Sequence, residues 1–325
     1  MIFTLKFYKI VKYLCVLNGE FIVMTTNKMG TGTAHSKLIL IGEHSVVYGQ
    51  PAIALPVTLL KTTVTISSIK YGQYIENNES RRRLVVLGDE FEGVRQLILR
   101  LLEKFHSVKL PFSLEIDSNI PLGRGLGASA ALATAITRAF YDFFDAELTD
   151  EMLLSFANFS ENITHGRSSG IDVATVNSEL PLWFIKGQTA ESFDINLSGY
   201  LVIGDSGVHG FTSQAISIVR EKLSENKTKA QGHIEKLGQL SKASKDFLMT
   251  NKLKDLGQVI KQAHENLSSL GVSHPRLDTL VDTALRNGAL GAKLTGSGLG
   301  GVMVALAANE KDAIRISQKL LKNGA

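Results

Sequence analysis

The sequence predicts an α+β protein of two domains. Three observations support this prediction: a length of 325 residues, strand-like and helical patterns in both halves of the chain, and a glycine-rich turn in each half. Domains usually contain about 100–200 residues, so a chain of this length has room for two. Hydrophobic residues make up 44% and charged residues 20% of the chain, which is typical of a globular protein. No internal repeat or proline-rich linker separates the halves, so we expect them to pack tightly.

The composition excludes several classes of function. Cys15 is the single cysteine, which excludes a disulfide framework and a cysteine-based metal cluster. No uninterrupted apolar run is long enough to span a bilayer. The sequence pI is 9.0, but residues 1–28 contain four lysines and one glutamate, a net +3 of the total +4. The rest of the chain is therefore close to neutral, and we expect no nucleic-acid partner.

Residues 1–23 differ from the rest of the chain. They are apolar, but Lys6, Lys9, Lys12 and Glu20 interrupt them, and no small-residue cleavage site of a signal peptide follows. Two interpretations remain: a start codon upstream of Met24 or Met29, or a short surface helix lying on a membrane. We favour the first, treat residues 1–28 as an extension outside the fold, and expect no stable membrane association.

The first strand of the main body is predicted over Ala34–Ile41, and Lys37 interrupts its apolar pattern. The segment Gly42-Glu43-His44-Ser45-Val46-Val47-Tyr48-Gly49 follows it. Lys37 has two interpretations that the residues alone leave open. Its ammonium group could snorkel to the surface, or it could be a cation directed at a phosphate or substrate.

The next elements follow from local patterns of apolar residues. A polar segment, Tyr71–Ser80, is expected to form a loop between two strands. An amphipathic helix and a further strand then precede the first glycine-rich turn. The expected elements are strands over Thr62–Ile69 and Arg82–Leu87, a helix over Gly93–His106 and a strand over Pro111–Asp117.

The first glycine-rich turn, Pro121–Ala131, stands between a predicted strand and a long helix. Its sequence is Pro-Leu-Gly-Arg-Gly-Leu-Gly-Ala-Ser-Ala-Ala. Alternating glycines allow positive φ angles and a close approach to a ligand, and the helix that follows offers unpaired N–H groups to an anion. No lysine follows the glycines, so the turn is not a Walker P-loop. Gly125–Ala130 fits the looser dinucleotide pattern G-x-G-x-x-[GA], and a tight connection without any ligand is the other possibility.

A second helix is predicted over Asp150–Thr164, with a cap signal at its start. Glu161 and His165 lie four residues apart near its end, where they share a helix face and could hold a metal or simply form a surface hydrogen bond. Asp172 lies at the end of the small-residue turn that follows. An aspartate in a turn is usually a cap, but its position next to the Glu/His pair makes it a candidate site residue. An apolar run (Val173–Val176) and a strand (Leu180–Lys186) come next.

The second half contains mostly helical patterns. A strand is expected over Phe193–Ile203, and a second glycine-rich turn, Gly291–Gly301, precedes a buried strand over Val302–Ala307. This turn is either a β-bulge or packed crossover, or a backbone that closes against a ligand or against the first glycine-rich turn. The expected helices are Thr212–Leu223, Gly232–Met249, Leu253–Leu270 and Pro275–Asn287.

Four segments in this order resemble the motifs of the GHMP kinase superfamily (galactokinase, homoserine kinase, mevalonate kinase and phosphomevalonate kinase). They are Lys37 with Gly42–Gly49, Pro121–Ala131, Glu161 with His165–Asp172, and Lys293–Gly301. The first and third are most similar to the mevalonate kinases. The resemblance covers residues 30–325 and implies the two-domain GHMP kinase fold. That fold has an N-terminal ribosomal-protein-S5-like α/β domain, expected over residues 29–190, and a C-terminal ferredoxin-like α+β domain, expected over residues 191–325.

The resemblance also implies an activity. It predicts transfer of the γ-phosphoryl group of ATP to the 5-hydroxyl of (R)-mevalonate, with Mg²⁺ as cofactor, in the route from mevalonate to isoprenoids. The expected partners are ATP and mevalonate, the expected location is the cytoplasm, and the expected state is a monomer or homodimer. Three alternatives remain: phosphomevalonate kinase or another GHMP small-molecule kinase, a sensor that binds nucleotide or metabolite without turnover, and an NAD-dependent dehydrogenase.

The site residues implied by the resemblance fall into four groups. Asp172 matches the proposed base, and Lys37 matches a lysine beside the reacting groups. Ser129 and Glu161 match the two Mg²⁺ ligands. Substrate-side positions are Glu43, His44, His165 and Ser169, and ATP-binding positions are Gly123, Arg124, Gly125, Leu126, Gly127, Ala128, Ser129 and Ala130.

Two departures from the family pattern stand close to these residues. Arg167-Ser168 replaces the usual Asn-Pro, and Ala128 replaces a serine that is common in the first glycine-rich turn. Neither removes a group to which a chemical role is assigned. We therefore expect them to change affinity and stability rather than chemistry.

Overall fold

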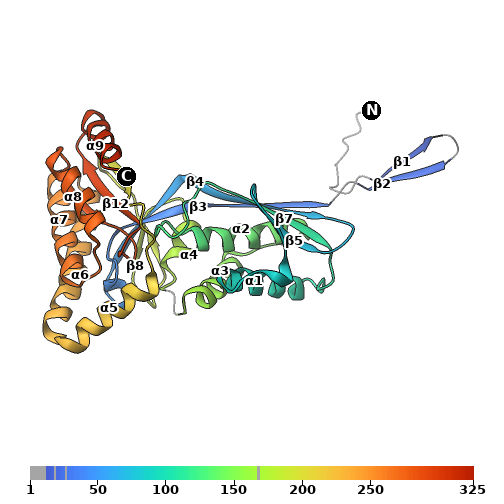
Figure 1. Cartoon of the computed structure of the whole chain (residues 1–325), viewed down its shortest axis with the longest axis horizontal. Coiled ribbons are helices and arrows are strands. Elements are labelled where there is room, and N and C mark those ends of the chain that lie inside the picture. Colours follow the sequence, from blue (N-terminus) through green and yellow to red (C-terminus); the bar gives the residue numbers. More distant parts are fainter. Residues whose placement is uncertain (1–11, 18–19, 26–27, 167–168) are drawn as a thin grey trace.

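The computed structural model describes residues 12–17, 20–25, 28–166 and 169–325. The strands are β1 (Lys12–Leu17), β2 (Glu20–Thr25), β3 (Met29–Ile41), β4 (Ala52–Ser68), β5 (Gln73–Glu76), β6 (Arg81–Arg83), β7 (Phe112–Ser118), β8 (Leu182–Phe184), β9 (Glu191–Ser192), β10 (Tyr200–Asp205), β11 (Gly291–Leu294) and β12 (Val302–Ala307). The α-helices are α1 (Glu92–Lys104), α2 (Ala128–Phe143), α3 (Asp150–His165), α4 (Ile171–Val176), α5 (Thr212–Glu225), α6 (Lys227–Met249), α7 (Leu253–Ser269), α8 (Pro275–Arg286) and α9 (Glu310–Lys322). Helices α5–α9 gather at one end of an elongated molecule, α1–α4 lie along the long strands in its middle, and the β1-β2 pair lies at the other end (Figure 1).

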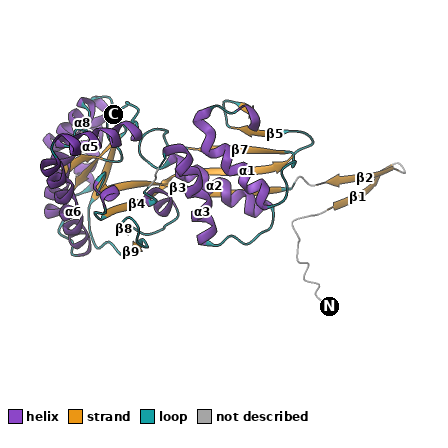
Figure 2. Ribbon diagram, turned by 90° about the horizontal axis from the view of Figure 1, so that it is seen from below, coloured by secondary structure: helices purple, strands orange, loops and turns teal. Residues whose placement is uncertain are grey.

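The N-terminal sheet has the strand order β6-β5-β7-β4-β8-β9, with β3 paired to β4. Its pairs are antiparallel except for β5 and β7. Helices α1, α2 and α3 cover one face of this sheet (Figure 2). Helix α2 lies directly on β3 because Gly30 and Gly32 carry no side chain: a Cβ on Gly32 would lie 2.1 Å from the carbonyl oxygen of Ala135. This close packing fixes the start of α2 beside Lys37.

The C-terminal part is built around the three-stranded antiparallel sheet β10-β12-β11. Helices α7, α8 and α9 pack against these strands, and α6 packs on α7. The apolar core of this part also includes Leu40, Ile41 and Ile53 from the ends of β3 and β4. The two long strands therefore run from one core into the other. The fold is the two-domain α+β architecture that the sequence predicts.

The change from one sheet to the other gives a position for the domain boundary. β9 ends at Ser192 in the N-terminal sheet, and β10 begins at Tyr200 in the C-terminal sheet. We propose that the boundary lies between these two strands.

The helices of the described part of the chain include none with the length and hydrophobicity that a membrane span needs.

Three sequence predictions of local structure are wrong in part. The expected loop Tyr71–Ser80 contains β5, which pairs with both β6 and β7. The expected strand Arg82–Leu87 is strand only to Arg83 and continues as a 3₁₀ turn over Leu84–Val86. The expected strand Phe193–Ile203 becomes regular only at Tyr200.

The predicted extension lies partly outside the described residues, which begin at Lys12. Where it is described, it forms strands rather than a helix: β1 pairs antiparallel with β2 in a two-stranded sheet of its own. Lys28 already contacts the main body, because its Nζ atom lies 3.8 Å from Oδ2 of Asp145.

Candidate active site

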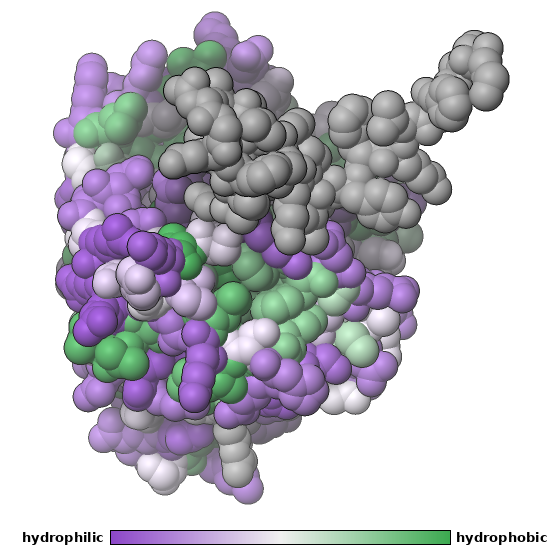
Figure 3. Space-filling model, turned by 90° about the vertical axis from the view of Figure 1, so that its right-hand side faces the viewer, coloured by the Kyte–Doolittle hydropathy of each residue, from purple (hydrophilic) through white to green (hydrophobic). Residues whose placement is uncertain are grey.

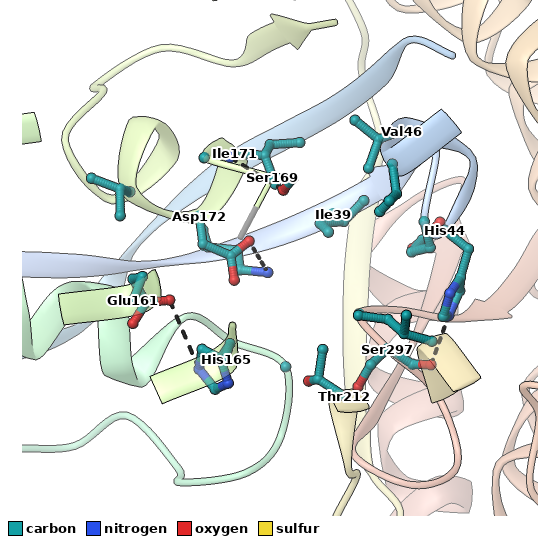
Figure 4. A pocket seen from close by; sticks show the side chains of 18 residues that line it. Ile39, His44, Val46, Glu161, His165, Ser169, Ile171, Asp172, Thr212 and Ser297 are labelled. Carbon is teal, nitrogen blue, oxygen red and sulfur yellow. Dashed lines mark hydrogen bonds and ion pairs between the residues drawn. The ribbon is translucent and has the colours of Figure 1, made fainter. Parts of the chain in front are cut away.

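A cavity of about 150 Å³ lies where the two domains meet (Figure 4). An apolar cavity of this volume admits a molecule such as benzene, so the site suits a small metabolite rather than a macromolecule. One part of its wall is apolar and the other carries charged or polar groups. The apolar lining is Ile39, Val46, Val47, Ile171, Val173 and Ile216, and the polar lining includes Lys37, Glu43, His44, Glu161, His165, Ser169, Asp172, Thr212 and Ser297.

Lys37 is buried and forms an ion pair at the centre of this cavity. Its side chain is 2% exposed, and its Nζ atom lies 2.8 Å from Oδ1 of Asp172, whose side chain is 36% exposed. The interpretation of Lys37 as a snorkelling surface residue is therefore wrong. Because Oδ1 is engaged by the lysine, the second carboxylate oxygen of Asp172 is available to a ligand.

Asp172 owes its position to a short helix that the sequence pattern did not reveal. The apolar run after it is the helix α4, which starts after Gly170 in the left-handed conformation (φ 85°). Ile171, Val173 and Val176 are buried in the protein. Asp172 lies between these buried positions, in the first turn of the helix, and points toward Lys37 (Figure 4).

The first glycine-rich turn wraps around Lys37. The backbone N–H of Lys37 donates to the carbonyl of Leu126 at 3.1 Å. Gly127 has a φ of +75°, and a Cβ there would lie 2.7 Å from Cγ of Lys37. Helix α2 begins at the next residue, and among the described residues no side chain caps its first turn. The first N–H groups of α2 are thus open to an anion, which the positive end of the helix dipole also favours.

Ser129 and Glu161 are in direct contact, as expected for two groups that share a ligand. The Ser129 hydroxyl donates to Oε1 of Glu161, and Oε2 of Glu161 lies 3.9 Å from Nε2 of His165 (Figure 4). Burial raises the pKa of the Glu161 carboxyl, and the hydrogen bond from Ser129 opposes this rise. A nearby cation would stabilise the ionised form of this buried carboxylate.

The donor set around Glu161 fits a magnesium ion. A hydroxyl and a carboxylate are hard oxygen ligands, and Mg²⁺ usually takes only one or two carboxylates together with water and phosphate oxygens. Within the described residues, no group of three or more His, Cys, Asp or Glu side chains could form an all-protein metal cage. The site therefore fits a metal that arrives with a phosphate ligand.

Glu43 and His44 connect the cavity to the second glycine-rich turn. Nε2 of His44 lies 2.8 Å from the carbonyl oxygen of Ser297. Because a carbonyl only accepts hydrogen bonds, Nε2 carries the proton, and Nδ1 remains as an acceptor. Burial lowers the pKa of His44, and the positive charge of Lys293 adds to this effect. The imidazole is therefore neutral near pH 7.

The two glycine-rich turns touch each other, as one of the sequence interpretations predicted. A Cβ on Gly125 would lie 3.3 Å from Cα of Gly296, and a Cβ on Gly296 would lie 3.1 Å from Cα of Gly125. Both contacts are tighter than ordinary Cβ packing. The second turn therefore packs against the first from the C-terminal domain.

The structure brings most of the predicted site residues together. Lys37, Glu43, His44, Gly125, Glu161, His165, Ser169 and Asp172 line the cavity, and Ser129 adjoins it through Glu161. Arg124 instead faces the C-terminal domain, where its Nε donates to Oδ2 of Asp205 at 2.8 Å. Residues 167–168, where the sequence departs from the family pattern, lie outside the described residues.

Sequence reasoning missed the residues that the C-terminal domain contributes. Thr212 and Ile216 from α5, and Ser297 from the second turn, line the same cavity. Thr212 follows a turn rich in small residues, Gly204–Gly210, which was the available signal. Thr212 lies 40 residues from Asp172 in the sequence (212 − 172), so the sequence does not show that both line one cavity.

Comparison with known proteins agrees with this geometry. The N-terminal domain of the GHMP kinases matches residues 92–178, and the C-terminal domain of the GHMP kinases matches residues 243–325. The mevalonate kinase of Pyrococcus furiosus is 32% identical over 316 residues, which cover 88% of this chain and 92% of that protein. The mevalonate kinase of Pyrococcus abyssi is also 32% identical, over 314 residues, which cover 89% of this chain and 91% of that protein.

Solved structures with a similar fold include proteins of the same family. The crystal structure of mevalonate kinase from methicillin-resistant Staphylococcus aureus has a TM-score of 0.71 and 35% identity, and covers 92% of this chain and 96% of that chain. A phosphomevalonate kinase from Streptococcus pneumoniae has a TM-score of 0.76 but only 16% identity, over 90% of this chain and 97% of that chain. The fold is thus shared by proteins of both activities.

Proposed function

Because the chain belongs to the GHMP kinase family, we propose that it transfers the γ-phosphoryl group of ATP to the 5-hydroxyl of (R)-mevalonate, giving 5-phosphomevalonate. The observation that carries this proposal is the ion pair of Lys37 and Asp172, 2.8 Å apart, between a glycine-rich turn and a small cavity. A base beside a cation is what an alcohol needs to attack a phosphoryl group. Membership of this family excludes the NAD-dependent dehydrogenase alternative.

The nucleotide occupies the first glycine-rich turn in this proposal. Its phosphates accept hydrogen bonds from the open N–H groups at the start of α2, after Gly127. A second cavity, of about 200 Å³, lies one helical turn further along α2 at Leu132. Apolar side chains gather on this end of the N-terminal domain (Figure 3). We place the adenine ring in this cavity, which is lined in part by Ile75, Leu87, Val94, Ile116 and Leu132.

Mevalonate occupies the cavity at the domain junction. Its apolar wall, which includes Ile39, Val46 and Ile171, suits a short carbon chain with a methyl branch. Its polar wall supplies the acceptor Nδ1 of His44 and the hydroxyl of Ser169. A pocket with one apolar and one polar side orients a small branched acid and places one end of it at Asp172.

Ser129 and Glu161 would hold Mg²⁺ together with phosphate oxygens, since they are adjacent hard oxygen donors. The ion, when bound, neutralises charge on the transferring phosphoryl group. Lys37 adds a positive charge beside Asp172. Asp172 accepts the proton of the 5-hydroxyl through the oxygen that Lys37 does not engage.

The test of the proposed function is an ADP-release assay with four acceptors in parallel: mevalonate, phosphomevalonate, galactose and homoserine. We expect turnover with mevalonate in the presence of Mg²⁺ and ATP. Turnover with phosphomevalonate alone would assign the other kinase activity. Binding of ATP and mevalonate without ADP release would assign a sensor. We propose the cytoplasm as the location, because ATP and the water-soluble acceptor are both present there.

A further inference from the structure

The first glycine-rich turn is held from both domains. On the N-terminal side, the carbonyl of Leu126 accepts hydrogen bonds from the backbone N–H of Lys37 at 3.1 Å and from the hydroxyl of Ser36 at 2.7 Å. On the C-terminal side, the backbone N–H of Gly210 donates to the carbonyl of Gly123 at 3.2 Å. Arg124 lies between these two anchored residues of the turn.

The side chain of Arg124 adds an ion pair with the C-terminal domain. Its Nε donates to Oδ2 of Asp205 at 2.8 Å, and the two side chains are 19% and 37% exposed. Oδ1 of Asp205 accepts a hydrogen bond from the backbone N–H of Gly207 at 2.9 Å, so both carboxylate oxygens are engaged. Asp205 is also the last residue of β10, where it pairs with Val302 of β12. The ion pair therefore ties the glycine-rich turn to a regular strand.

The backbone of Arg124 packs against the same region of the C-terminal sheet. A Cβ on Gly301 would lie 2.9 Å from the carbonyl oxygen of Arg124, and Gly301 has a φ of +75°. The carbonyl of Gly301 in turn accepts a hydrogen bond from the hydroxyl of Ser206 at 2.6 Å. The end of β10 and the start of β12 therefore set the position of Arg124 through both its side chain and its backbone.

This geometry disfavours the role that the family resemblance implies for Arg124, which is direct contact with ATP. The guanidinium group is directed to the C-terminal domain, and the Asp205 carboxylate beside it offsets its positive charge. The backbone N–H groups that are open to a phosphate lie further along the chain, at the start of α2. Arg124 can influence these groups through the position of the turn.

We propose that Arg124 is a positioning residue: its ion pair with Asp205 holds the first glycine-rich turn in the geometry that receives the nucleotide phosphates. This inference rests on the proposed function, which places ATP in this turn. Nucleotide affinity falls in proportion to the fraction of molecules whose turn has the binding geometry. Neither residue lines the cavity proposed for mevalonate, so losing the pair should weaken ATP binding more than mevalonate binding.

The experiment compares Arg124→Gln with Asp205→Asn in the full chain, by measuring kcat, both KM values and the thermal midpoint. We expect each variant to raise the KM for ATP about fivefold, the size expected for one partly exposed ion pair. The KM for mevalonate should stay within about twofold. An ATP KM that stays within about twofold in both variants would overturn the proposal.

Asp205→Asn separates positioning from direct binding of a phosphate by Arg124. If Arg124 bound the nucleotide itself, removing the charge of Asp205 would leave the ATP KM unchanged or lower it, and either result would overturn the positioning role. The double variant Arg124→Gln/Asp205→Asn should raise the ATP KM no more than the larger single effect, because the two residues act as a unit. An additive rise, about 25-fold, would show two independent contributions and contradict the inference.

Arg315→Gln is the matched control, because it removes an ion pair that lies wholly within the C-terminal domain. Arg315 pairs with Asp312 on α9, and its Nε donates to the carbonyl of Asn287 after α8 at 3.0 Å. We expect this variant to lower the thermal midpoint slightly and to keep the ATP KM within about twofold. An equal rise of the ATP KM in Arg315→Gln would mean that the effect reflects general stability, and it would overturn the positioning role.

Titration of the chain and its variants with Mg-ATP in the absence of an acceptor keeps this inference separate from the proposed function. Failure of the unmodified chain to phosphorylate mevalonate would refute the proposed function. The about fivefold weaker binding of ATP by Arg124→Gln and Asp205→Asn should still be measured in that case. Equal ATP affinity of the unmodified chain and both variants would refute the role of the ion pair.

Discussion

Replacing Gly127 with alanine tests whether the first glycine-rich turn sets the position of Lys37. Gly127 has a φ of +75°, and the added Cβ would lie 2.7 Å from Cγ and 3.2 Å from Cε of Lys37. Real Cβ atoms essentially never approach another atom closer than 3.0 Å, so the lysine side chain must shift. Lys37 is 2% exposed and has little free space to move into.

The effects of Gly127→Ala on stability and on turnover can both be estimated. A left-handed conformation costs an alanine about 1–2 kcal/mol, and an overpacked core contact costs about 1–3 kcal/mol more. A shift of about 1 Å at a reacting group can reduce turnover about 100-fold. We therefore expect kcat to fall by about 10–100-fold and the thermal midpoint to fall by several degrees.

Gly187→Ala is the control for backbone strain alone. Gly187 has a φ of +84°, and a Cβ there meets nothing within 4 Å. It lies between β8 and β9, away from the cavity. We expect this variant to lose stability by about 1–2 kcal/mol while its kcat stays within about twofold of the unmodified enzyme. ADP release and thermal unfolding measure both quantities, and wild-type kcat in Gly127→Ala would refute the steric reasoning.

Four further predictions follow from the site and the fold. Asp172→Asn should lower kcat by about 10²–10⁴-fold and leave nucleotide binding intact; turnover equal to the unmodified enzyme would remove Asp172 as the base. Glu161→Gln should raise the Mg²⁺ concentration for half-maximal rate, and an unchanged Mg²⁺ titration would show that this residue makes only a local contact. Burial lowers the pKa of His264 in the folded chain. Below about pH 6.5 the unfolded chain therefore takes up a proton that the folded chain does not. The thermal midpoint should rise as the pH rises through this range, and it should rise less steeply in His264→Gln. A chain that begins at Met24 should keep its kcat/KM, because β1 pairs only with β2 among the described strands; lost activity would make residues 1–23 part of the enzyme.

The elements that sequence reasoning predicted well carry strong periodic patterns of apolar residues. Helix α2 begins at Ala128, and its buried face includes Ile136 and Phe140. β5 was missed because all four of its residues are partly exposed. It is stabilised by pairing with β6, which follows it after a turn, and with β7, which is distant in the sequence. Val85 and Val86 suggested a strand but are 73% and 66% exposed in a 3₁₀ turn. Local propensity does not show whether a β-branched residue finds a pairing partner.

The candidate site shows the same limit. The motifs around Lys37, Ser129 and Asp172 could be placed in order from the sequence, because each is a local pattern. The pairing of Lys293 with Glu43 joins residues 250 positions apart and depends on how the two domains dock. One of the interpretations that the sequence left open was that the second glycine-rich turn closes against the first. The buried ion pair beside this contact emerged only from the structure.

Proton-coupled phosphorus NMR of the reaction product tests the central claim most directly. We expect a phosphate ester of a primary alcohol, whose phosphorus signal is split into a triplet by the adjacent methylene protons. We also expect this signal to appear at the same rate as ADP, and to appear about 10²–10⁴-fold more slowly in Asp172→Asn. A singlet from a tertiary ester, or inorganic phosphate as the only new signal besides those of ADP, would contradict transfer to the 5-hydroxyl of mevalonate.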